Sequence, residues 1–261
     1  MNKKKRSGNG NGTCHESGNG NGNGNGKGVK KKEIKSSTRG IAKPIAKRIS
    51  ITAKSENQKK LLKSIKENLV TITAGPAGSG KTLLAVVSGL REFVMGNYDK
   101  MIFTRPCVEA NGENLGFLPG DLNEKINPYM YPIFEFLADY LTQDQIEYYM
   151  KENLFQTLPL AYQRGCTFKN AVVILDEGQN TTPEQFRMFL TRIGDNCKVI
   201  ITGDPTQNDI KGINGLVDAC DRLTNVTNLN IVYLKREDIF RNPIVAEIED
   251  AYSAEKIEVK I

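Results

Sequence analysis

The chain has 261 residues, of which 39% are hydrophobic and 25% charged, a balance typical of a globular protein with one substantial domain or two small ones. No apolar run approaches the roughly 20 residues needed to span a bilayer, and no apolar stretch follows the basic N-terminus, so we expect neither a membrane partner nor a secretory signal. Five scattered cysteines without a CxxC pair argue against zinc ribbons and disulfide scaffolds, and the single histidine, His15, argues against histidine-based catalysis.

The basic charge is confined to an N-terminal tail. Residues 1–54 hold 14 Lys and Arg against two Glu, whereas residues 55–261 hold 22 Lys and Arg against 28 Asp and Glu. Residues 1–40 are a low-complexity run rich in Asn, Gly and Lys that lacks the side chains of a core, so we predict a disordered tail. It is either a solubilising leader or an arm that binds polyanions such as nucleic acid. Residues 41–54 are expected to be a linker or a first short strand.

Strands and helices alternate along the rest of the chain, which we predict to be one domain over residues 55–261. Compact β-branched runs predict buried strands at residues 69–73, 101–104, 171–175, 198–202 and 229–234. Caps and apolar spacing predict helices that begin near residues 55, 82, 121, 143, 182, 214 and 242, with a loop over residues 105–120. This alternation predicts an α/β fold with a mostly parallel sheet covered by helices on both faces.

A glycine-rich run joins the first strand to the second helix and matches the pattern GxxxxGK[ST], the P-loop, in its required context. Its glycines permit backbone angles that direct successive N–H groups toward phosphate oxygens. The lysine brings a charge to the β and γ phosphates, and the threonine hydroxyl is a hard ligand for Mg²⁺. The sequence therefore predicts an ATP and Mg²⁺ site, with a chance glycine-rich turn as the alternative. The run consists of Gly75, Pro76, Ala77, Gly78, Ser79, Gly80, Lys81 and Thr82.

Polar residues also follow two later strands. Asp176 ends the strand at residues 171–175 and is expected to reach Mg²⁺ beside the P-loop, as a Walker B aspartate does. Glu177 is then placed to orient and deprotonate the attacking water, although an acidic pair at a helix start is the structural alternative. Gln207, in the run TGDPTQ (residues 202–207), could sense the γ-phosphate or position water, because ligands gather at the carboxyl ends of parallel strands.

In the order Gln58, GPAGSGKT, DEGQ and GDPTQ, these residues resemble the first, RecA-like motor lobe of a superfamily 1 helicase. More closely, residues 55–252 resemble the PhoH-like family of phosphate-starvation-inducible P-loop ATPases, which many phages also carry. The most specific match is LGFLPGDL (residues 115–122). Two departures are DEGQ at residues 176–179, where the family has DEAQ, and about one additional residue within EANGENL (residues 109–115).

The resemblance implies roles for two glutamines. Gln58 would read the adenine edge, although it could equally complete the capping box of its own helix. Gln179 would couple the motif of Asp176 and Glu177 to the γ-phosphate, although it could simply cap the following turn.

The resemblance also raises the source of a catalytic arginine. Superfamily 1 helicases take theirs from a second motor lobe, which we expect to be absent because about nine residues follow Tyr252. An arginine that meets the γ-phosphate would therefore come from this lobe or from a neighbouring subunit. Arg241 is the leading candidate, with a structural salt bridge as its alternative role. The other candidates are Arg192, Arg236 and Arg164.

The resemblance implies a Mg²⁺-dependent ATPase, in the cytoplasm, or in the host cytoplasm if a phage encodes it. Coupling to RNA or single-stranded DNA and assembly as a homo-oligomer, with a ring as one form, are further expectations. A second class of function is a nucleotide-dependent binding module whose hydrolysis resets partner binding, and a small-molecule kinase is a third. Nucleic-acid-stimulated turnover would favour the first class, and partner release without nucleic acid the second.

Overall fold

The computed structural model describes residues 49–106, 122–207, 209–210, 212–240 and 244, with the backbone alone for residues 122–129. The predicted tail, most of the predicted loop at residues 105–120 and nearly all of the predicted helix from residue 242 lie outside this part of the chain. Within it, six parallel strands form one sheet in the order β3-β2-β4-β5-β1-β6. The strands are β1 (Val70–Ala74), β2 (Lys100–Thr104), β3 (Phe155–Thr157), β4 (Ala171–Leu175), β5 (Cys197–Gly203) and β6 (Leu229–Tyr233).

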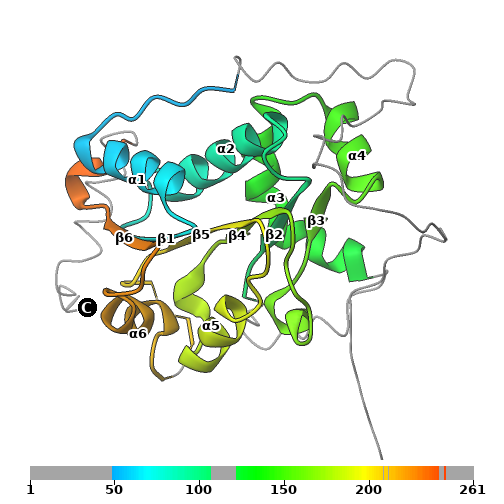
Figure 1. Ribbon diagram of the computed structural model, residues 1–261. Coiled ribbons are helices and arrows are strands. Elements are labelled where there is room, and N and C mark those ends of the chain that lie inside the picture. Colours follow the sequence, from blue (N-terminus) through cyan, green and yellow to red (C-terminus); the bar gives the residue numbers. More distant parts are fainter. Residues whose placement is uncertain (1–48, 107–121, 208, 211, 241–243, 245–261) are drawn as a thin grey trace, which may run out of the picture.

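Helices cover both faces of the sheet (Figure 1). One face packs against α1 (Glu56–Glu67), α2 (Lys81–Val94), α3 (Leu122–Ala138) and α4 (Gln143–Lys151), and the other against α5 (Pro183–Leu190) and α6 (Gly215–Arg222). Three short 3-10 helices follow strands: η4 (Leu160–Gln163), η5 (Gly178–Asn180) and η6 (Arg236–Asp238). The predicted α/β class is confirmed: the chain has the RecA-like P-loop NTPase fold, with a parallel sheet between two layers of helices.

The central strands are rich in apolar and β-branched residues because both of their faces are buried. In β4, Val172 and Ile174 pack into the core beneath α2 and α3, whereas Ala171, Val173 and Leu175 pack into the core beneath α5 and α6. Every residue of β1, β4 and β5 is buried. Because these strands pair in parallel, the carboxyl ends of β1, β2, β4 and β5 lie at one edge of the sheet, where the loops that follow them meet.

Two features differ from the sequence predictions. Strand β3 was missed because its three residues are too few to make an apolar run. Of the two expectations for residues 41–54, a linker or a first strand, the described residues 49–54 form no strand, and Ile49 is 1% exposed and packs into the core. Cys197 and Cys220 are buried free thiols, but Cys166 is disulfide-bonded, which the scattered cysteines did not predict. None of the helices in the described part of the chain is both long and apolar enough to cross a bilayer.

Candidate functional site

The P-loop connects the end of β1 to the start of α2, as predicted. Gly78 and Gly80 have positive φ angles of 79° and 84°, which favour glycine because a Cβ would clash with the backbone. Gly80 is the N-cap of α2, and no side chain caps the first turn of this helix. The first N–H groups of α2 are therefore directed toward the cleft, together with the positive end of the helix dipole.

Lys81 and Thr82, the first two residues of α2, bring a charge and a hydroxyl to the loop. The Lys81 ammonium donates hydrogen bonds to the carbonyl oxygens of Gly75 and Pro76, at 2.7 and 2.8 Å. The Thr82 hydroxyl donates to Asp176 Oδ1 at 2.8 Å, across 94 residues of sequence. This hydrogen bond connects the P-loop to the end of β4, where the sequence predicts a ligand for Mg²⁺.

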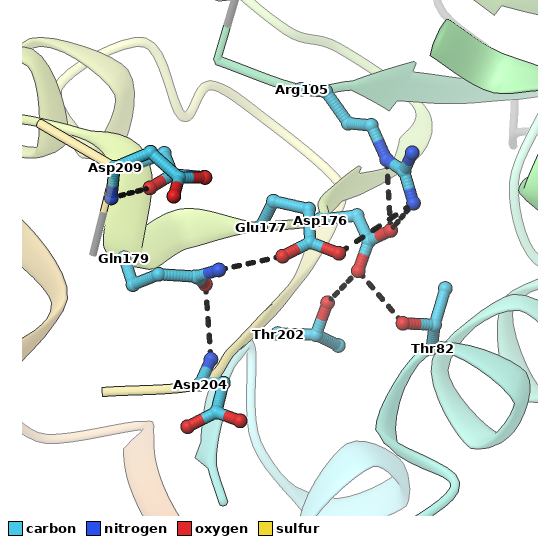
Figure 2. A network of polar contacts seen from close by, with 9 residues as sticks. Thr82, Arg105, Asp176, Glu177, Gln179, Thr202, Asp204 and Asp209 are labelled. Atoms are coloured by element: carbon cyan, nitrogen blue, oxygen red, sulfur yellow. Dashed lines mark hydrogen bonds and ion pairs between the residues drawn. The ribbon is translucent and has the colours of Figure 1, made fainter. Parts of the chain in front are cut away.

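Asp176 is the centre of a hydrogen-bond network at the end of β4 (Figure 2). Its Oδ1 accepts from the hydroxyls of Thr82 and Thr202, the latter at 2.5 Å. Its Oδ2 accepts from Nε of Arg105, at 2.9 Å, and from Nη2 of the same side chain. Asp176 is 2% exposed, so its charge is held by these donors in place of water.

Glu177 follows with an unusual backbone. Its φ and ψ are 58° and 40°, the left-handed conformation that a residue with a Cβ adopts at a cost of about 1–2 kcal/mol. The side chain is 43% exposed, and its Oε2 accepts a hydrogen bond from Gln179 Nε2 at 2.6 Å. Such strain is concentrated at functional sites because only specific surroundings maintain it. Here it directs a carboxylate into the cleft beside Asp176.

Gln179 connects this motif to the end of β5. Its Nε2 donates to Glu177, and its Oε1 accepts from the backbone N–H of Asp204 at 3.0 Å (Figure 2). Gln179 is 1% exposed, so both ends of its amide are used inside the protein. The alternative of a simple turn cap does not account for these two contacts.

The glycine at position 178 has a local steric explanation. A Cβ added to Gly178 would lie 3.2 Å from Ile201 Cγ2 and 3.3 Å from the Thr202 carbonyl oxygen, closer than most real contacts. The alanine of the usual family pattern would require these neighbours to move by a few tenths of an ångström. The departure therefore changes packing behind the motif, and both carboxylates still face the cleft.

These elements enclose a cleft of about 310 Å³ at the carboxyl edge of the sheet. Gln207 also borders it, so the three predicted motifs meet at one place. A larger hollow of about 460 Å³ between α5 and α6 contains none of these residues, so its size alone does not indicate function. The cleft is lined by Ala77, Gly78, Gly80, Lys81, Thr82, Leu83, Phe136, Asp176, Glu177, Gly203, Asp204 and Gln207.

Gln58 is next to the P-loop but does not make the predicted capping box. Ser55 caps α1 by accepting from the Gln58 N–H at 3.1 Å, which is the first half of that motif. The Gln58 side chain instead accepts from the Lys54 N–H at 2.7 Å and donates to the Ser79 carbonyl oxygen at 2.9 Å. Gln58 therefore supports the P-loop from behind, and its role toward adenine stays a prediction.

The candidate arginines are in different places. Arg241 lies outside the described residues. Arg192 lies at the amino end of β4, where its carbonyl oxygen accepts from the Phe168 N–H, so it is at the edge of the sheet opposite the cleft. Arg236 begins η6, after β6, and Arg164 is the C-cap of η4, after β3, where it borders a hollow beside α5. Neither residue is among those that line the cleft.

Arg105 was missed as a site residue, although it contacts the central carboxylate. The available signal was its position directly after a predicted buried strand, β2, in the run Thr104-Arg105-Pro106. Ligands of parallel sheets bind at such positions.

Comparisons with known proteins identify the family of this chain. The family model described as PhoH-like protein matches residues 50–253. The PhoH-like protein of Bacillus subtilis (strain 168) is 46% identical over 209 residues, which are 79% of this chain and 65% of that protein. Protein PhoH of Escherichia coli (strain K12) is 38% identical over 218 residues, or 82% of this chain and 61% of that protein.

This chain spans a little under two thirds of the length of these relatives. Among solved structures, the Pif1 helicase from Candida albicans aligns over 78% of this chain and 44% of its own, at 14% identity and a TM-score of 0.39, too weak a superposition to bear on function. The family match and the sequence identities, together with the P-loop and its partner motifs, show that this chain belongs to the PhoH-like protein family.

Proposed function

We propose that this protein binds ATP with Mg²⁺ in the cleft and hydrolyses the bond between the β and γ phosphates. The observation that carries this proposal is the hydrogen bond between Thr82 and Asp176 beside the uncapped start of α2, with Glu177 in the same cleft. Phosphate-binding amides, a metal-binding oxygen pair and a base are three of the components that enzymes use to transfer a phosphoryl group to water.

The residues present fit a magnesium ion. Mg²⁺ prefers oxygen ligands and commonly uses one or two protein oxygens, with phosphates and water completing its shell. Thr82 Oγ1 and the Asp176 carboxylate provide such oxygens 2.8 Å apart. When bound, the ion would neutralise charge on the phosphate oxygens.

In this proposal the polar groups of the site have separate tasks. The first amides of α2 and the Lys81 ammonium hold the phosphates, and binding requires Lys81 to exchange its two carbonyl partners for phosphate oxygens. Glu177 accepts the proton of the attacking water, which general bases do with a rate contribution of about 10²–10⁴-fold. The Gln179 amide holds the Glu177 carboxylate, and Gln207 borders the cleft where it could orient the water.

We further propose that turnover is coupled to RNA or single-stranded DNA. The chain of hydrogen bonds from Glu177 through Gln179 to Asp204 supports such coupling, because a movement after β5 would shift the base. The order of motifs, similar to that of a helicase motor lobe, favours a polynucleotide as the partner. The alternative, a nucleotide-dependent binding module, would use the same chain of hydrogen bonds from Glu177 to Asp204, but its partner would be a protein in place of nucleic acid.

The experiment is ATP turnover by the full chain, with and without RNA or single-stranded DNA, together with its mass in solution. Lys81→Ala should abolish turnover and weaken nucleotide binding, because it removes the charge that meets the phosphates. Lys66→Ala is the matched control, since Lys66 is an exposed lysine in the last turn of α1. Full turnover in Lys81→Ala would contradict the assignment of the site, whereas turnover unaffected by nucleic acid would contradict only the coupling.

A further inference from the structure

Arg105 contacts both carboxylates of the site. It follows β2 and points across the end of β4 (Figure 2). Two of its N–H groups, on Nε and Nη2, donate to Asp176 Oδ2, and Nη2 lies 3.9 Å from Glu177 Oε1. Its side chain is 16% exposed and that of Asp176 is 2% exposed, so little water screens the pair.

The Asp176 carboxylate is fully engaged by these contacts. Oδ1 accepts from Thr82 and Thr202, which are neutral hydroxyls, and Oδ2 accepts from the charged fork of Arg105. Among the described residues, Arg105 is therefore the charged side chain whose hydrogen bonds to Asp176 balance its negative charge. A divalent cation bound beside Asp176 would balance the same charge, and two cations a few ångströms apart in a poorly screened site repel each other.

We propose that Arg105 is a positioning residue that exchanges with Mg²⁺ at Asp176. Arg105 holds Asp176 and Glu177 at the edge of the cleft, and it must withdraw from Oδ2 when the metal and nucleotide bind. Because the metal must displace this ion pair before it binds, the intact pair weakens metal binding, and Arg105 thereby sets the magnesium concentration at which the site fills. This inference rests on the proposed function, because it concerns the same metal and nucleotide.

A purely structural ion pair would behave differently. Its loss would lower stability and weaken nucleotide binding with and without metal, but it would leave the magnesium requirement unchanged. Exchange predicts the opposite pattern, in which removing the guanidinium leaves nucleotide binding without metal largely as it was and makes the metal bind more tightly. The magnesium dependence of binding therefore separates the two roles without reference to turnover.

The test uses the full chain and a fluorescent ATP analogue that cannot be hydrolysed. Binding is measured in EDTA and then at increasing MgCl₂ for wild type, Arg105→Gln and Arg105→Lys. In Arg105→Gln, the magnesium concentration for half-maximal binding should fall by about tenfold or more, the scale on which one neighbouring charge shifts proton affinity of a carboxylate. Arg105→Lys keeps the positive charge but lacks the planar guanidinium that donates two hydrogen bonds to one carboxylate. The magnesium concentration for half-maximal binding should therefore fall less in this variant. Arg222→Gln, at an exposed surface arginine on α6, is the matched control.

An unchanged or raised magnesium requirement in Arg105→Gln would overturn the exchange. If circular dichroism shows that Arg105→Gln is unfolded, Arg105→Lys is compared with wild type instead. An equal magnesium requirement in Arg105→Lys and wild type would then overturn the exchange. Wild-type protein that binds no analogue at any magnesium concentration would instead refute the proposed function, and the exchange with it. Wild-type binding combined with an unchanged requirement in the variant would refute the exchange alone.

Discussion

Gln179 offers the sharpest test of the link between the base and the rest of the site. Gln179→Leu keeps a similar volume and removes both amide hydrogen bonds, to the Glu177 carboxylate and from the Asp204 N–H. The hydrogen bond to Glu177 is charge-assisted, and such a bond contributes about 1.5–3 kcal/mol. We take the lower end of this range because the Glu177 side chain is 43% exposed. Loss of the second hydrogen bond leaves the backbone N–H of Asp204 without this partner, and because Asp204 is 4% exposed, the cost is about 1–3 kcal/mol.

Since the leucine also buries apolar atoms, we expect a net loss of about 2–4 kcal/mol in the free energy of unfolding. Equilibrium unfolding in guanidinium chloride measures this loss. The control is Gln143→Leu on α4, where an exposed amide donates to Glu147 at 2.9 Å, and we expect a change within about 0.5 kcal/mol there. Turnover should fall in Gln179→Leu because Glu177 loses its support, while binding of the ATP analogue persists.

Two results would refute this reasoning. A stability loss in Gln179→Leu no larger than that of Gln143→Leu would mean that the two buried hydrogen bonds contribute nothing net. Full turnover in a folded Gln179→Leu protein would mean that Glu177 does not depend on Gln179 for its position, and the proposed relay to Asp204 would have no role.

Three further predictions address the base, the tail and assembly. Glu177→Gln should bind ATP normally but turn over about 10²-fold more slowly or worse, and loss of binding would show that Glu177 is structural or a metal ligand. Deleting residues 1–40 should leave basal turnover unchanged, and if the tail is a nucleic-acid arm, the salt dependence of nucleic-acid binding should flatten; equal slopes would favour the solubilising role. If Arg241 acts across a subunit interface, Arg241→Ala should be inactive alone but recover turnover when mixed with Lys81→Ala. A monomer with full specific activity would exclude that arrangement.

Several elements were predictable from sequence because their determinants are local. The strands β1, β4 and β5 are buried on both faces, so β4 appears as an unbroken apolar run and β1 and β5 as compact runs rich in β-branched residues. The helix α5 begins with a threonine cap, a proline in its first turn and a capping box, all within four residues. The P-loop pattern likewise combines backbone freedom and side-chain chemistry in eight consecutive residues.

Other features depend on residues that are distant in sequence. Lys198 was predicted only as part of a strand, but its ammonium donates to the carbonyl oxygens of Ile65 and Asn68 and thus caps the C-terminus of α1. The bond to Ile65 joins residues 133 apart. Burial lowers the pKa of this ammonium, an effect that no local pattern reveals.

The sequence by itself determined the class of fold, the P-loop and the two strand ends that carry Asp176 and Gln207, because each depends on neighbours along the chain. Only the tertiary structure decided that Arg105 contacts Asp176, 71 residues away, and that Gln179 joins Glu177 to Asp204. The physical reason is that a parallel sheet brings the carboxyl ends of non-consecutive strands together. A charged side chain that follows one strand therefore contacts a partner that follows another strand, and the order of the strands in the sheet decides which partner that is.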